Sequence, residues 1–182
     1  VTMSSLNRSR RTLIIVLIAF LLPVIIAWVI LDQHWYQAGT NKGTLMANPV
    51  ALEQAEALPE GWKLAYVPPK ECQQACQNAL FVMNQIDVAV GKDTDRVTPI
   101  VLTAAQRQDI AQYHQQFDFQ DVVSADLLAQ LDELPINTLF IIDPLNNVML
   151  YYPTHADKEA MVLEGKNVLA DLRKLLKLSR IG

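Results

Sequence analysis

The chain has 182 residues and a formal net charge of −4 at pH 7. An acidic chain lacks the basic surface that nucleic acids require, so we exclude a nucleic-acid partner. Only two cysteines are present, and a domain of about 145 residues buries a hydrophobic core without disulfide staples.

The first predicted element is a membrane-spanning helix at residues 12–31. This run, TLIIVLIAFLLPVIIAWVIL, carries no charge. About 20 residues at roughly 1.5 Å each cross a hydrocarbon core of roughly 30 Å. The run is longer than the apolar core of a secretory signal, so we expect an uncleaved anchor. Pro23 removes one backbone hydrogen bond, which membrane helices tolerate.

The charges on either side of this helix predict its orientation. Arg8, Arg10 and Arg11 lie in the tail at 1–11, whereas Asp32 follows the helix. Positive charge stays inside, so the tail is expected in the cytoplasm. The aromatic belt expected at the opposite interface comprises Trp28, Trp35 and Tyr36. We therefore predict a single-pass protein of the bacterial inner membrane with its C-terminal domain in the periplasm.

Beyond the anchor, residues 32–60 are predicted to form a linker and domain edge, and residues 61–182 a single domain. A strand is expected at 62–67, because the run is apolar and Pro68-Pro69 ends it. Apolar residues then recur every three or four positions from 72 to 90, which indicates a helix that Gly91 ends. A second strand at 97–103 completes a βαβ unit with parallel strands.

The second half of the domain continues with helices and one hairpin. Two short helices are expected at 104–117 and 124–132, followed by a β-hairpin with strands at 138–143 and 148–152. The last helix, at 156–177, has one apolar side made of Met161, Leu169, Leu172, Leu175 and Leu176. The order βαβ, helix, β-hairpin, helix is that of the thioredoxin fold, so we predict an α/β, thioredoxin-like domain.

Cys72 and Cys76 carry most of the functional information. If both lie on the first turn of a helix, their thiols share one face, where the helix N-terminus favours the thiolate. Such a pair can cycle between dithiol and disulfide or offer two soft sulfurs to a metal ion. We therefore predict a catalytic and a metal-binding role for both. The alternative is a pair of inert thiols or a structural disulfide, although so short a loop would add little stability.

Three segments carry a resemblance to a known family. The Cys-x3-Cys after the strand, the later IIDPLNNVMLYY and the final DLRKLLK are similar to the Sco family of membrane-anchored, thioredoxin-fold proteins. The likeness covers about residues 43–177. The segments ECQQACQ and GKDTDRVTPIVLT resemble more closely a group of Sco-like proteins encoded among cytochrome oxidase genes in proteobacteria.

The resemblance implies copper as a cofactor, and a cytochrome c oxidase subunit or its assembly factors as partners. Sco proteins serve copper delivery and thiol chemistry during assembly of the CuA centre. Their third copper ligand is a histidine, and the matching position in this chain is Pro135. Cys72 and Cys76 are thus the only ligands that carry over.

The remaining histidines and methionines do not complete a metal site. His114 is expected on a solvated helix, His155 in a loop or at a helix N-cap, and His34 at the membrane boundary. The methionines, which could offer thioethers to Cu(I), are spaced as core residues; they are Met83, Met149 and Met161.

The leading hypothesis is a membrane-anchored, Sco-like accessory factor in cytochrome c oxidase biogenesis. It would act through the dithiol of Cys72 and Cys76 on copper or on CuA-site thiols. The alternatives are a general periplasmic thiol-disulfide oxidoreductase and a non-catalytic, oxidase-associated interaction protein. The motifs of hydrolases, P-loop proteins and dinucleotide-binding enzymes are absent. The sequence leaves open whether the chain is an enzyme.

Overall fold

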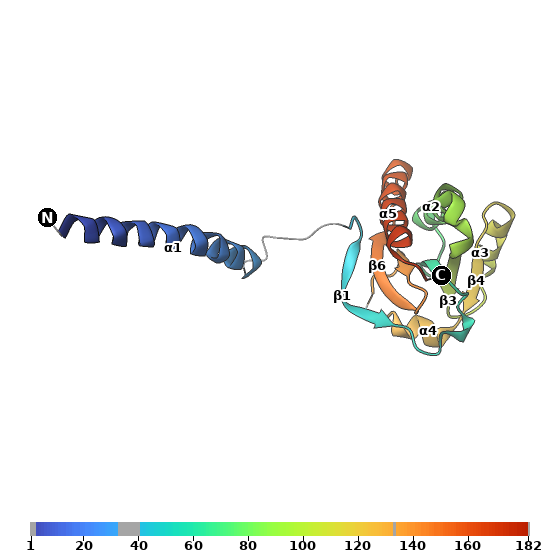
Figure 1. Ribbon diagram of the computed structural model, residues 1–182. Coiled ribbons are helices and arrows are strands. Elements are labelled where there is room, and N and C mark those ends of the chain that lie inside the picture. Colours follow the sequence, from blue (N-terminus) through green and yellow to red (C-terminus); the bar gives the residue numbers. More distant parts are fainter. Residues whose placement is uncertain (1–2, 33–40, 133, 182) are drawn as a thin grey trace. The chain divides into compact units, whose positions relative to one another are not determined.

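The computed structural model describes residues 3–32, 41–132 and 134–181 (Figure 1). The chain forms two compact units, Val1–Thr40 and Asn41–Gly182. Residues 41–60, which were expected within the linker and domain edge, belong to the second unit. His34, Trp35 and Tyr36 lie outside the described residues.

The first unit contains helix α1, Met3–Asp32, with Pro23 inside it. Its described side chains are those of residues 10–26, 28 and 29, and Phe20, for example, is 73% exposed. Over the residues that the structure describes, no helix is long and apolar enough to cross a membrane. The membrane span at 12–31 therefore stays a prediction.

The second unit is built on a sheet whose six described strands follow the order β1-β6-β5-β2-β3-β4. The pairs β2·β3 and β3·β4 are parallel, and the other neighbours are antiparallel. The strands are β1 Thr44–Ala51, β2 Trp62–Val67, β3 Val97–Thr103, β4 Gln120–Val123, β5 Thr138–Ile142 and β6 Asn147–Pro153. The parallel βαβ unit and the hairpin within the same sheet are both confirmed.

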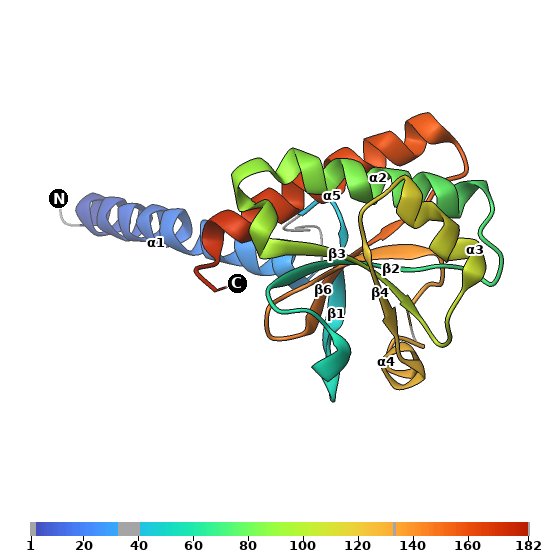
Figure 2. The same ribbon diagram turned by 90° about the vertical axis from the view of Figure 1, so that its right-hand side faces the viewer.

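The helices cover the two faces of this sheet unequally. Two long helices, α2 (Gln74–Val90) and α5 (Lys158–Leu178), lie side by side on one face, and the short α4 (Ala125–Gln130) lies on the other (Figure 2). The remaining short elements are η1 Ala55–Ala57, η2 Gly91–Arg96, α3 Gln108–Ala111 and η3 Gln112–Gln115.

The core is divided by the sheet into two clusters. Leu64 and Tyr66 of β2 face the cluster under α2 and α5, whereas Ala65 and Val67 face the cluster under α4. All six residues of β2 are buried, so this strand is the centre of the domain.

The structure differs from the sequence-based expectation in three segments. The expected linker contains the edge strand β1, which pairs with β6, and the expected helix at 104–117 is reduced to α3 and η3. The edge strand β4 was not predicted, because three of its four residues are exposed and show no apolar pattern. These strands form because a neighbouring strand supplies their hydrogen bonds, a partner that local sequence does not show.

One buried carboxylate ties the beginning of the domain to its last helix. Asp171 of α5 is 2% exposed, and its Oδ2 accepts hydrogen bonds from the backbone N–H groups of Lys42 at 2.7 Å and Gly43 at 2.8 Å. The hydroxyl of Tyr152 on β6 donates to the same oxygen at 2.9 Å. Burial raises the pKa of Tyr152, and the charge of Asp171 raises it further, so the hydroxyl stays a donor.

We predict that Asp171→Ala lowers the free energy of unfolding by about 2 kcal/mol, because the buried hydroxyl of Tyr152 and the backbone N–H groups of Lys42 and Gly43 lose their acceptor. Asp171→Asn keeps one acceptor oxygen and should cost less. The exposed residue Asp95 gives the matched control, since Asp95→Ala should change stability by less than about 0.5 kcal/mol. Urea unfolding followed by fluorescence measures all three variants, and equal stability of Asp171→Ala and the control would contradict this account.

Candidate functional site

The two cysteines lie where the central strand gives way to the first helix of the βαβ unit. They form a disulfide with a Cα–Cα distance of 5.1 Å. Helix α2 begins at Gln74 with Gln73 as its N-cap, so Cys72 lies in the preceding turn and Cys76 in the first helical turn. The two cysteines thus lie together at the start of the helix, with Cys72 just before the N-cap and not yet in the helix itself.

The two sulfurs differ in exposure. Cys76 is 1% exposed and belongs to the core cluster that contains Tyr66, whereas Cys72 is only partly buried and packs against that cluster. Thiol-disulfide exchange requires an incoming thiolate to reach one sulfur of the bond. Cys72 is the more exposed residue of the pair, while Cys76 also lines a surface cavity together with Pro69 and Asn137.

The helix carrying Cys76 is fixed by a buried amide. Asn78 is 5% exposed, and its Nδ2 donates to the backbone carbonyls of His155 at 3.2 Å and Ala156 at 2.8 Å. Its Oδ1 accepts from Gln74 at 2.9 Å. The first two turns of α2 are thereby held against the segment that leads into α5.

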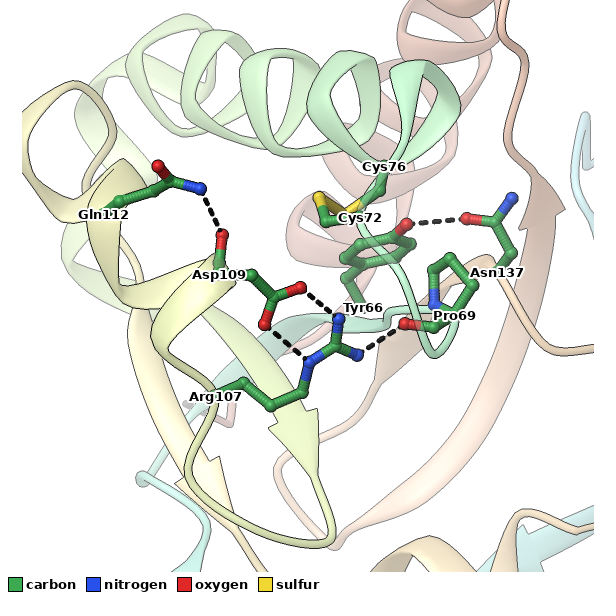
Figure 3. Close-up of a disulfide and its surroundings, with 8 residues drawn as sticks. All are labelled: Tyr66, Pro69, Cys72, Cys76, Arg107, Asp109, Gln112 and Asn137. Carbon is green, nitrogen blue, oxygen red and sulfur yellow. Dashed lines mark hydrogen bonds and ion pairs between the residues drawn. A yellow bond between two sulfur atoms is a disulfide. The ribbon is translucent and has the colours of Figure 1, made fainter.

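An ion pair from the segment after β3 supports the cysteine turn. Arg107 Nε donates to Asp109 Oδ1 at 3.0 Å, and its Nη1 donates to the carbonyl of Pro69 (Figure 3). The hydrogen bond from Arg107 holds the pKa of Asp109 below its ordinary value, and the backbone N–H of Cys72 adds a smaller contribution in the same direction. The carboxylate of Asp109 therefore stays ionised next to Cys72.

A hydrogen-bonded pair of side chains, Tyr66 and Asn137, also lies beside the disulfide. The hydroxyl of Tyr66 donates to Asn137 Oδ1 at 2.6 Å (Figure 3). Burial raises the pKa of Tyr66, while the charge of Arg107 opposes that rise. Asn137 has a left-handed backbone with φ 60, and its N–H donates to the carbonyl of Val67 at 3.2 Å. The start of β5 is thereby tied to the end of β2.

Sequence reasoning missed these four residues, Tyr66, Arg107, Asp109 and Asn137. Three of them lie more than 30 residues after Cys72 in the chain, and none belongs to a local motif. Only the packing of β2, β3 and β5 in one sheet brings them to the cysteines.

The other candidate ligands are engaged elsewhere. His114 Nε2 lies 2.7 Å from Asp121 Oδ2, and His155 Nε2 lies 3.6 Å from Glu164. The buried Met83 and Met161 are core residues, as expected, and Met149 packs against the same cluster. Pro135 lies in the exposed loop before β5.

The described residues do not fit a copper site of three ligands. No group of three His, Cys, Asp or Glu side chains that could hold a metal ion occurs in the described part of the chain. After reduction the pair would offer two thiolates. The polar side chains drawn beside it, those of Tyr66, Arg107, Asp109, Gln112 and Asn137, carry oxygen and nitrogen groups, which suit Cu(I) poorly (Figure 3).

The sheet order and the cysteine pair at the start of α2 place the domain in the thioredoxin-like class of folds, which thiol oxidoreductases use. The chain belongs to the family described as "Transmembrane-like, thioredoxin-like, C-terminal domain", whose model matches residues 62–179. A search of curated protein sequences finds no match.

Solved structures show the same fold at low sequence identity. Apo Sco1 from Thermus thermophilus is similar with a TM-score of 0.54 and 16% identity over 77% of this chain and 99% of that chain. The copper-bound ScoI of Arabidopsis thaliana is similar with a TM-score of 0.47 and 14% identity, over 64% of this chain and 87% of that chain. The bacterioferritin comigratory protein of Xanthomonas campestris is similar with a TM-score of 0.47 and 17% identity, over 63% of this chain and 79% of that chain. The expected thioredoxin-like fold is confirmed.

We predict that, after reduction, Cys72 is alkylated faster than Cys76, because only Cys72 is partly exposed. The ratio should be about tenfold or more, and denaturation should abolish it. Peptide mapping by mass spectrometry after brief treatment with iodoacetamide measures both sites. Equal labelling of the two thiols in the folded chain would contradict the assignment of Cys72 as the more accessible thiol.

Proposed function

We propose that this chain is a membrane-anchored, Sco-like accessory factor that exchanges thiols and disulfides with a client protein during cytochrome c oxidase assembly. The observation that carries the proposal is a disulfide at the end of a central strand whose two cysteines differ in exposure, Cys76 being buried and Cys72 only partly so. A structural staple gains nothing from leaving one sulfur accessible, whereas an exchange site needs this arrangement.

In the proposed exchange, a client protein with two thiols reduces the disulfide of this chain and becomes oxidised to a disulfide itself. A client thiolate attacks Cys72 Sγ, a mixed disulfide forms, and the sulfur of Cys76 leaves as a thiolate that takes up a proton. The second client thiol loses its proton and attacks the client sulfur of the mixed disulfide, which releases Cys72 as a thiolate. Two electrons pass from the client to the chain, and the reduced chain reverses each step with an oxidised client.

The client is proposed from the sequence resemblance and from the expected anchor. A domain tethered near the periplasmic face of the membrane would meet the cysteines of the CuA site during oxidase assembly. Copper bound by the reduced Cys72 and Cys76 remains part of the proposal only as a two-thiolate complex, which favours Cu(I).

The proposed topology places residues 1–11 in the cytoplasm and the second unit in the periplasm. We predict that alkaline phosphatase fused after residue 60 is active, because this enzyme matures only in the periplasm. Replacing Arg8, Arg10 and Arg11 by glutamate should lower that activity, since the positive charge that orients the helix is lost. An inactive wild-type fusion, with an active β-galactosidase fusion at the same site, would overturn the topology.

The biological role predicts that deleting the gene lowers the activity of a CuA-type cytochrome oxidase in membranes. The double variant Cys72→Ser/Cys76→Ser should fail to restore it, because exchange needs both sulfurs. Oxygen uptake with reduced cytochrome c measures the activity, and Asp95→Ala serves as the complementing control.

The outcomes separate the candidate functions. Rescue of the double variant by a small-molecule reductant supports dithiol chemistry, and rescue by added copper supports copper handling. Full complementation by the double variant would replace the proposal with a non-catalytic interaction role. Normal oxidase activity with misoxidised periplasmic proteins would replace it with general thiol exchange.

A further inference from the structure

We propose that a large apolar cavity under α4 binds a bulky apolar side chain of the client, a few residues from the client cysteine that pairs with Cys72. This inference rests on the proposed exchange function and names the substrate class, an extended protein segment with a cysteine and a nearby apolar residue.

The cavity exists because one face of the sheet is thinly covered. Helix α4 has six residues, whereas α2 and α5 have 17 and 21. The space left beside α4 has a volume of ≈ 690 Å³, within the range of about 300–1,000 Å³ typical of ligand pockets. Most of its lining is aliphatic or aromatic, including Val67, Leu102, Leu128, Leu131, Leu134 and Phe140.

The cavity adjoins the disulfide. Pro69 and Lys70 line it and also line a second cavity of ≈ 410 Å³ to which Cys76 and Asn137 contribute. The loop that carries Pro69 and Lys70 is thus a shared wall between the two. Cys72 is bonded to Cys76, which lines the second cavity, so a client that reacts at Cys72 starts next to this shared wall.

The position of this wall is maintained by Arg107, which lines the apolar cavity and donates to the carbonyl of Pro69. The charge of Arg107 is paired with Asp109, so it does not oppose an apolar occupant. At the rim, Ile136 is 73% exposed directly before Asn137. An extended segment that crosses from one cavity to the other would cover this side chain.

A protein segment is favoured over a small thiol because a small thiol would fill only the space at the disulfide. A lipid chain or a second copy of this chain would fill the apolar cavity without any link to a client cysteine. The dependence of the exchange rate on the client sequence therefore distinguishes these occupants.

The test uses the full chain with Cys76→Ser, so that Cys72 carries the only thiol. Short peptides with one cysteine, activated as the 2-thiopyridyl disulfide, carry either Phe or Ala at one chosen position near that cysteine. Cys72 attacks the peptide sulfur, and the released pyridine-2-thione reports the rate. Glutathione activated in the same way serves as the probe without an apolar side chain.

We expect Phe at one or more of these positions to raise the second-order rate constant about tenfold over Ala, because burying an aromatic ring in the cavity stabilises the encounter. Ala105→Trp, which fills the cavity from an exposed lining position, should bring the ratio close to one and leave the glutathione rate unchanged. Ile136→Ser should reduce the ratio in the same direction.

Matched controls lie outside the cavity. Ala129→Trp changes an exposed alanine of α4 that is not among the lining residues, and Leu145→Ser changes a leucine that is 69% exposed in the hairpin turn. Both should keep the preference for Phe. Equal rates for Phe and Ala peptides, or a preference that survives Ala105→Trp, would overturn the cavity assignment alone. A Cys72 that reacts with neither peptides nor glutathione would overturn the exchange function together with it.

Discussion

The end of β2 is the constraint on which the site depends. Six consecutive buried residues hold this strand between β3 and β5, and two prolines follow it. Proline supplies no donor to a sheet ladder, so the chain must leave the sheet at this point. It then turns once before α2 begins, and that turn leaves Cys72 partly buried and Cys76 in the core.

The turn is not held by its own sequence. Arg107 and Asp109, from the segment after β3, contact it through the carbonyl of Pro69 and the N–H of Cys72. Asn137, at the start of β5, binds both Val67 and the hydroxyl of Tyr66. Each neighbour of β2 in the sheet thus contributes one support, so the two sulfurs are positioned by tertiary contacts.

The two faces of the sheet differ in how closely helices cover them. On one face α2 and α5 approach so closely that a Cβ at Gly165 would lie 2.5 Å from the side chain of Val82, so there is no room for a side chain at this position unless Val82 shifts. On the other face the short α4 leaves an open apolar cavity beside the loop of Pro69. Both cysteines belong to the side that α2 and α5 cover, while the thin layer leaves space beside the loop that precedes Cys72.

The sequence by itself determined the elements whose signals are local. The apolar run of β2, the periodicity of α2 and α5, the hairpin around Asp143-Pro144 and the place of the cysteine pair were all predicted, and the thioredoxin-like order followed from them. The tertiary structure decided what depends on distant partners. Strands β1 and β4 need a neighbour to form, and α2 begins at Gln74 because the disulfide turn precedes it. Arg107, Asp109 and Asn137 reach the cysteines only through the sheet, since residues that meet across strands leave no spacing pattern in the chain.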